Sequence, residues 1–198
     1  MNGGNMAVKR ASCPSCGVDV DAYVMLRQGV EITHCSICGL VIPDESKSEQ
    51  SLELLKCVAL AEDAAALRTM LEKMLVEQKV TRTVVSATNG AEFVTLASKR
   101  LKEGLPISVA ILDVEMPTMT GIQAAVTLRK LETSLGVKRK TPLLFFTSKP
   151  CDERFKAMLK QLEPSSYVNK GQDPEPLQLV KRVHKVLNIL FNKNAEAV

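Results

Sequence analysis

Hydrophobic and polar residues follow two different patterns along the chain, and the change falls near residue 50. Within residues 13–39, the segments VDVDAYVML and VEITH alternate in the way of strands and flank a polar RQG turn, which predicts a β-hairpin. A stretch containing PDESKSEQ follows and is typical of a linker. We therefore predict a small module at 1–40, a linker at 41–53 and a larger domain at 54–194.

The larger domain shows short apolar runs that are separated by helical patterns. The strand candidates are KCVALA, TRTVVSA, ISVAILD, TPLLFFTS and SSYVNK. The helix candidates are the run from Leu67 to Leu75, NGAEFVTLASKRL, GIQAAVTLRKLETSLG, DERFKAMLKQL, and the run from Pro174 to Phe191 with Asp173 as N-cap. Regular alternation of strand and helix requires crossover connections, so it predicts a doubly wound α/β fold with a five-stranded parallel sheet.

Composition and charge narrow the class of protein. The chain is 45% hydrophobic and 24% charged, which fits a folded protein with a substantial core. It has no apolar run of roughly 20 residues and no apolar signal segment at its N-terminus, so we expect a cytoplasmic protein that does not enter a membrane. Few residues follow Leu190, so we expect any output to come through a surface of the domain or through the small module.

Four of the six cysteines form two Cys-x-x-Cys pairs, Cys13 with Cys16 and Cys35 with Cys38. Their spacing, C-x₂-C-x₁₈-C-x₂-C, is typical of a structural Zn²⁺ site, and four thiolates leave no open position for water. A redox dithiol and an iron–sulfur cluster are the alternatives, and two knuckles around a hairpin favour zinc. We expect His34 to pack or stay exposed beside this complete shell.

The two remaining cysteines stand alone in the sequence, and the small module is acidic. We expect Cys57 and Cys151 to be ordinary small residues. Residues 1–50 carry four basic and six acidic side chains, although the whole chain has a net charge of +4. Phosphate binding needs clustered lysine and arginine, so this balance argues against nucleic-acid binding by the module.

Polar side chains end the predicted parallel strands. Glu62 and Asp63 follow the first strand, Asp113 ends the third, Thr147 the fourth and Lys170 the fifth. The carboxyl ends of parallel strands meet at one edge, where ligands bind in such sheets. Clustered carboxylates need a cation, and Mg²⁺ prefers oxygen ligands. The sequence therefore predicts a Mg²⁺ site in which Asp113 attacks a phosphoryl donor and becomes an aspartyl phosphate, with Thr147 and Lys170 offsetting charge.

The larger domain resembles the receiver domains of two-component response regulators, of the kind found in bacterial chemotaxis regulators. The resemblance covers about residues 55–191 and is carried by AED at 61–63, ILDVEMPTMTG at 111–121, FFTS at 145–148 and YVNK at 167–170. It implies a flavodoxin-like fold, with Asp113 as phosphoacceptor and Glu62 and Asp63 as the acidic pair. It also implies that Glu115 offers a backbone carbonyl to Mg²⁺ and that Tyr167 is a rotameric switch. Thr147 and Lys170 would be the switch hydroxyl and the phosphate-binding lysine.

The sequence departs from the family at several loop positions. Ser148 stands where the family prefers Ala and could narrow access to the phosphoryl site. Gly171 stands where it usually has Pro, which argues against a cis peptide after Lys170. Thr120 replaces a common Asp, and residues 164–166 replace a small Gly-Ala step. These changes affect loop geometry and kinetics more than the reacting groups.

We therefore predict a regulatory protein, and not an enzyme, that accepts a phosphoryl group from a histidine kinase. A downstream protein would bind the face formed by the fourth helix, fifth strand and fifth helix, or it would bind the small cysteine-containing module at 1–40, which we predict to be a zinc ribbon. The alternative is a phosphorylation-independent pseudo-receiver scaffold that binds partners through its zinc ribbon. A DNA-binding regulator is disfavoured by the acidic ribbon, and a hydrolase by the lack of a nucleophile elbow and by the position of His184 in the last helix.

Overall fold

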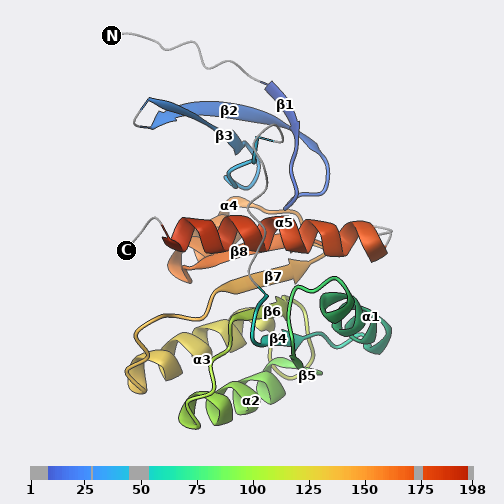
Figure 1. Cartoon of the computed structure of the whole chain (residues 1–198), viewed down its shortest axis with the longest axis vertical. Helices are drawn as coiled ribbons and strands as arrows, with labels where there is room; N and C mark the ends of the chain where they lie inside the picture. Colours follow the sequence, from blue (N-terminus) through green and yellow to red (C-terminus); the bar gives the residue numbers. More distant parts are fainter. Residues whose placement is uncertain (1–8, 28, 45–53, 172–175, 196–198) are drawn as a thin grey trace.

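The computed structural model describes residues 9–27, 29–44, 54–171 and 176–195. These residues form a three-stranded antiparallel sheet and a five-stranded parallel sheet that is flanked by helices on both faces (Figure 1). This is the predicted architecture, a flavodoxin-like α/β fold preceded by a β-hairpin. Among the described helices, none has the length and apolar character that crossing a membrane requires.

The small sheet carries the four paired cysteines at its ends. Its strands are β1 (Lys9–Ser12), β2 (Asp19–Arg27) and β3 (Val30–Cys35), in the order β1-β2-β3. The β2–β3 hairpin is the predicted one, with Tyr23 opposite His34. Strand β1 was not predicted, because KRAS has no alternation of apolar and polar residues. We call residues 9–42, which contain this sheet and both cysteine pairs, the cysteine ribbon.

The parallel sheet has the order β5-β4-β6-β7-β8. Its strands are β4 (Val58–Ala61), β5 (Val84–Ala87), β6 (Val109–Asp113), β7 (Leu143–Thr147) and β8 (Ser165–Asn169). Strand β6 is buried throughout, and its residues alternate between two cores. Val109 and Ile111 pack in one core, and Ala110 and Leu112 in the other. Burial on both faces explains why these strands are continuous apolar runs.

The helices divide between the two faces of the parallel sheet. They are α1 (Ala65–Glu77), α2 (Gly90–Lys102), α3 (Gly121–Ser134), α4 (Glu153–Gln161) and α5 (Pro176–Ala195). Buried residues of α1 and α5 share one core with the ribbon, and those of α2, α3 and α4 form the other. Figure 1 shows α5 lying between the parallel sheet and the ribbon.

Three of these helices begin at side-chain caps. Asn89 and Asp152 each accept a backbone amide at the start of α2 and α4, and Thr120 forms a capping box with Gln123 in α3. Helix α1 begins differently, and Asp63 does not cap it. Ala64 holds that position without a side-chain cap, because the helix begins at Ala65. The expected cap of α5, Asp173, lies outside the described residues.

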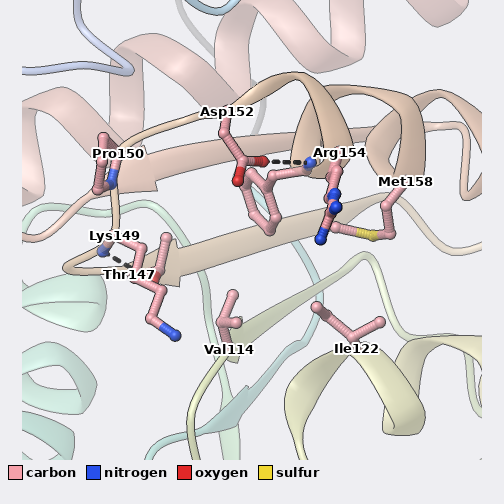
Figure 2. Close-up of a pocket in the computed structure, with 9 residues that line it drawn as sticks. Val114, Ile122, Thr147, Lys149, Pro150, Asp152, Arg154 and Met158 are labelled. Atoms are coloured by element: carbon pink, nitrogen blue, oxygen red, sulfur yellow. Dashed lines mark hydrogen bonds between the residues drawn. The ribbon is translucent and has the colours of Figure 1, made fainter.

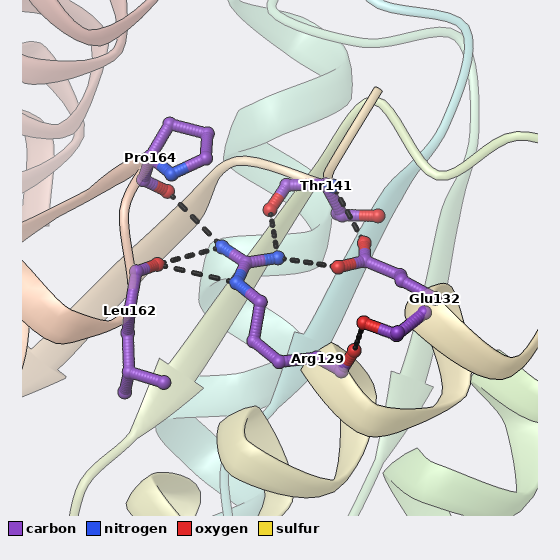
Figure 3. Close-up of polar contacts among 6 residues, drawn as sticks. Arg129, Glu132, Thr141, Leu162 and Pro164 are labelled. Atoms are coloured by element: carbon purple, nitrogen blue, oxygen red, sulfur yellow. Dashed lines mark hydrogen bonds and ion pairs between the residues drawn. The ribbon is translucent and has the colours of Figure 1, made fainter. Parts of the chain in front are cut away.

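A buried ion pair ties α3 to the neighbouring strands (Figure 3). Arg129 Nη1 lies 2.7 Å from Oε2 of Glu132, and both side chains are nearly inaccessible. The same guanidinium donates to the carbonyl oxygens of Thr141, Leu162 and Pro164, while the amide of Thr141 donates to Glu132. The pair therefore neutralises its own charge and also satisfies the backbone where β7 begins and where α4 turns into β8.

Candidate functional site

Polar side chains gather at the carboxyl edge of the parallel sheet, as the strand ends predict. Glu62 directly follows β4, Asp113 ends β6, Thr147 ends β7 and Lys170 follows β8. Carboxylate oxygens of Glu62, Asp63 and Asp113 lie within 4.8 Å of one another. The sheet thus brings residues that are far apart in the sequence into one acidic pocket.

Lys170 lies at the centre of this pocket. Its Nζ is 2.8 Å from Oε2 of Glu62 and 2.9 Å from Oδ2 of Asp113, and 5.2 Å from the centre of the Phe146 ring. Only 1% of the Glu62 side chain is exposed. Burial raises the pKa of Glu62 above its ordinary value, although the neighbouring Lys170 acts in the opposite direction.

The donor set of the pocket fits a hard divalent cation. Three carboxylates face one ammonium, which leaves a net charge of −2 when all are ionised. Among the described residues, Oε2 of Glu62 accepts no hydrogen bond, so the ion pair with Lys170 is its main compensation. Asp63 is exposed and can turn an oxygen into the pocket from its rim. Clustered carboxylate oxygens are the ligands that Mg²⁺ prefers.

Thr147 and Glu115 are two further residues of the predicted site. Thr147 is buried, and its Oγ1 accepts the amide of Lys149 at 3.1 Å. The amide of Glu115 lies 3.3 Å from Oδ1 of Asp113, whereas its exposed carboxylate forms a 2.6 Å ion pair with Lys149. This pair links the β6–α3 loop to the β7–α4 loop across the pocket. The role of the Glu115 carbonyl stays a prediction.

A cavity of about 270 Å³ extends from Thr147 along α4 (Figure 2). Its apolar wall includes Val114, Ile122 and Met158, and Lys149 and Asp152 lie at its edge. Ser148 is exposed and is not among its lining residues, so the larger side chain there does not narrow this cavity. The cavity leaves space beside the strand end that carries the Thr147 hydroxyl.

The loop that follows Asp113 is tightly packed. A Cβ at Gly121 would collide with the backbone oxygen of Asp113, so only glycine fits at the start of α3. Thr118 has a φ of 65°, a left-handed conformation that is costly for a β-branched residue. The bond between Lys170 and Gly171 is not cis, as we expected from the glycine. Among the described residues, a cis peptide bond occurs between Glu163 and Pro164.

The four paired cysteines converge in the ribbon. All four sulfurs lie within 4.8 Å of one another, with Cys13 to Cys38 at 3.7 Å and Cys16 to Cys35 at 3.8 Å. Four sulfurs about 2.3 Å from a central zinc in a tetrahedron would be separated by about 3.8 Å. The cysteines are free of disulfides, and this spacing fits one metal ion and is too close for an iron–sulfur cluster between them.

The other candidate residues are not part of this four-sulfur cluster. His34 stacks on Tyr23 with 5.3 Å between ring centres, and its Nδ1 lies 3.2 Å from the carbonyl oxygen of Gly39. Cys57 and Cys151 are buried and pack in the parallel domain. Burial raises the pKa of the Cys151 thiol to about 11.

The ribbon lies against the parallel α/β domain at Tyr167, and this contact was not predicted from the sequence. The side chain of Tyr167 is buried, and its hydroxyl is 3.0 Å from Sγ of Cys16. Its ring packs edge-on against Phe155 of α4, with 5.7 Å between centres. Burial, followed by the Cys16 sulfur, raises the pKa of Tyr167. A phenol that keeps its proton is placed to donate a hydrogen bond to Cys16 when that cysteine is a thiolate.

Two arginines at the site were also missed. Arg182 of α5 donates to the carbonyl oxygens of Pro14 and Ser15 in the ribbon and of Asn169 in β8. Arg68 of α1 donates to the carbonyl oxygen of Glu62, 2.7 Å away, and so holds the β4–α1 loop. A basic residue on an amphipathic helix is usually solvated, and no local signal in the sequence distinguishes these two.

The fold and the pocket together define a parallel α/β domain with an acidic pocket at the carboxyl edge of its sheet. A family model described as the response regulator receiver domain matches residues 58–183, more than half of the chain. The chain therefore belongs to the response regulator receiver family. No curated protein sequence matches the chain significantly.

Solved structures show the same fold at low sequence identity. The receiver domain of the Arabidopsis thaliana histidine kinase CKI1, in complex with Mg²⁺ and BeF₃⁻, has a TM-score of 0.58 and 20% identity over 70% of this chain and 92% of that chain. Chemotaxis protein CheY4 of Vibrio cholerae has a TM-score of 0.51 and 22% identity over 67% of this chain and 98% of that one. The CheX–CheY–BeF₃⁻–Mg²⁺ complex of Borrelia burgdorferi has a TM-score of 0.51 and 15% identity over 67% of this chain and 89% of that chain.

Proposed function

We propose that this protein is a response regulator that accepts a phosphoryl group from a histidine kinase on Asp113 and passes the signal on through protein contacts. The observation that carries the proposal is the ion pair of Lys170 with both Glu62 and Asp113 at the carboxyl edge of the sheet. Membership of the receiver family supports the same function.

The reaction follows from the groups in the pocket. An oxygen of the Asp113 carboxylate attacks the phosphorus, the phosphorus–nitrogen bond to the kinase histidine breaks, and its electron pair leaves with the imidazole. Lys170 contacts Asp113 now and is placed to bind the phosphoryl oxygens afterwards. The Thr147 hydroxyl, which accepts only a backbone amide in the described structure, is free to donate to the same oxygens.

Two groups of residues would hold the two proposed metals. Glu62, Asp63, Asp113 and the backbone carbonyl of Glu115 would hold Mg²⁺, which neutralises charge on the transferring phosphoryl group when bound. Relatives with the same fold were solved with Mg²⁺ and BeF₃⁻, which supports this assignment. The ribbon would hold Zn²⁺ as a structural ion through the thiolates of Cys13, Cys16, Cys35 and Cys38.

Phosphotransfer in the presence of Mg²⁺ tests the proposal. Wild-type protein is incubated in separate reactions with a labelled small phosphodonor such as acetyl phosphate and with a histidine kinase that carries a labelled phosphoryl group. Asp113→Asn serves as the control in both reactions. We expect label on the wild type from at least one donor, and none on the variant. Absence of label from every donor would overturn phosphoacceptor function and favour the pseudo-receiver scaffold.

Partner binding separates the same two functions a second time. A switching regulator binds its downstream protein with different affinity before and after phosphorylation. A scaffold binds equally well as wild type and as Asp113→Asn. Pull-down with both forms, followed by affinity measurement on the captured protein, distinguishes them.

A further inference from the structure

The ribbon covers the edge of the parallel sheet that the α4–β8–α5 face would present to a partner. Strand β8 is the edge strand, so its outer backbone groups need partners. The Asn169 amide donates to the carbonyl oxygen of Ser15 at 2.8 Å, and the Ser15 hydroxyl donates to the carbonyl oxygen of Tyr167. Ser15 is fully buried in this contact. The Cys13–Cys16 turn therefore caps β8 in the manner of an added strand residue.

Arg182 fastens the same turn from α5. Its Nε lies 2.9 Å from the Pro14 oxygen, and its Nη2 lies 3.0 Å from the Ser15 oxygen and 2.9 Å from the Asn169 oxygen. Among the described residues, the guanidinium forms no ion pair with a carboxylate. A zinc ion with four thiolates carries a net charge of −2, so Arg182 also supplies the complementary charge that a metal-loaded ribbon needs.

One dipeptide connects this contact to the acceptor pocket. The backbone of Asn169 binds Ser15 and Arg182. The next residue, Lys170, extends its ammonium to Asp113, and its backbone amide donates to the carbonyl oxygen of Thr147 at 2.7 Å. A phosphoryl group on Asp113 gives Lys170 new oxygen partners, and a shift of Lys170 moves the backbone to which the ribbon is attached.

We propose that the cysteine ribbon is an intramolecular ligand of the α4–β8–α5 face, and that a phosphoryl group on Asp113 loosens it. The linkage rests on the proposed phosphoacceptor function. The ribbon and the face mask each other in the described structure, so the partner is a protein that gains access to this face once the ribbon is displaced. The contact between the Tyr167 hydroxyl and the Cys16 sulfur exists only when the ribbon is docked, and a zinc-bound thiolate can only accept there. Linkage therefore requires that loosening the ribbon weakens its hold on zinc.

Zinc transfer from the full-length, zinc-loaded protein to an excess of colorimetric chelator measures this linkage. Beryllium fluoride with Mg²⁺ stands in for the phosphoryl group, and fluoride with Mg²⁺ alone is the control. We expect transfer to accelerate about fivefold or more in the wild type, the lower end of typical coupling between sites. Asp113→Asn should show no acceleration. Faster hydrogen exchange of the Asn169 amide, resolved by NMR, should accompany it.

Matched variants separate the docking contact from general stability. Arg182→Met should release zinc quickly without beryllium fluoride and respond little to it, whereas the exposed neighbour Lys181→Met should behave as wild type. Tyr167→Phe should accelerate release, whereas Tyr23→Phe, which alters the ribbon tyrosine stacked on His34, should not. Circular dichroism confirms that each variant is folded. If one variant fails to fold, the other pair of variants still tests the docking contact.

A ¹⁹F NMR signal from bound beryllium fluoride keeps the two claims apart. If it binds and both zinc transfer and Asn169 exchange are unchanged or slower, the linkage is overturned and the phosphoacceptor function stands. If it does not bind to wild type, the acceptor function fails and the linkage with it. A ribbon that takes up no zinc, with Asn169 exchange unaffected by beryllium fluoride, also overturns the inference.

Discussion

Lys170 Nζ lies 2.9 Å from Oδ2 of Asp113, although β8, which Lys170 directly follows, and β6, which ends at Asp113, are separated in the sheet by β7. The side chain crosses the end of β7 to reach the carboxylate, and it meets Glu62 from β4 at the same point. One ammonium thus compensates carboxylates from two other strands. The stability of this edge should depend on that balance of charge.

Replacing Lys170 by Met should destabilise the metal-free protein by about 3 kcal/mol, because two buried carboxylates lose their counter-charge. Urea unfolding measures the change, and Mg²⁺ should recover part of it. The exposed Lys149, paired with exposed Glu115, offers a matched control. Lys149→Met should change stability by less than about 1 kcal/mol. Equal losses in both variants would contradict a buried role for Lys170.

Asp113→Asn should stabilise the metal-free protein by about 1 kcal/mol, because it removes one of three mutually repelling carboxylates. The same change removes a Mg²⁺ ligand. Increasing concentrations of Mg²⁺ should therefore stabilise the wild type more than the variant, as measured by urea unfolding. If the two proteins gain equal stability from Mg²⁺, the ion binds somewhere other than this pocket.

Arg129→Met should cost about 3–5 kcal/mol, since it leaves the Glu132 carboxylate buried without its partner and several carbonyl oxygens without a donor. The Lys156–Glu153 pair has the same i, i+3 spacing in the next helix but an exposed carboxylate. Lys156→Met should cost less than about 1 kcal/mol in the same urea titration. A small loss in Arg129→Met would mean that the pair does not hold α3 to β7.

Thr118→Asn should raise stability by about 0.5–1 kcal/mol, because asparagine tolerates the left-handed backbone that Thr118 adopts beside the pocket. Thr118 is exposed, so its side chain loses little packing. Thermal unfolding monitored by circular dichroism measures the change. A destabilised variant would show that the hydroxyl or methyl group of Thr118 has a role that its contacts do not reveal.

Cys151 should react slowly with iodoacetamide at pH 8 in the folded, zinc-loaded protein. Burial raises the pKa of its thiol to about 11, and only the thiolate reacts. The rate should increase roughly tenfold for each pH unit until the pH approaches that pKa. Peptide mass spectrometry follows the modification of Cys151 alone, and the unfolded chain should react at the rate of an ordinary cysteine. A rate that is flat above pH 8 would exclude the raised pKa.

The acidic pocket could be predicted because most of its residues stand at the ends of apolar runs that the sequence itself identifies as strands. Parallel strands direct their carboxyl ends to one edge, so Glu62, Asp113, Thr147 and Lys170 converge wherever the strands pair in register. The cysteine cluster was predictable for the same reason, since two local pairs flank one hairpin.

The contact between the ribbon and the receiver could not be predicted. Ser15 and Asn169 are 154 positions apart, and their contact is made by backbone groups that any sequence possesses. Arg182 and Arg129 resemble solvated helix residues until the fold surrounds them.

Chemical trapping of the acceptor residue tests the central claim most directly. Protein treated with acetyl phosphate and Mg²⁺ is reduced with borohydride, which converts an aspartyl phosphate into homoserine, and the digested peptides are sequenced by mass spectrometry. The account predicts homoserine at position 113 in the treated protein and aspartate there when phosphodonor or Mg²⁺ is omitted. Unmodified Asp113 in a protein that carries phosphoryl elsewhere, or none at all, would contradict it.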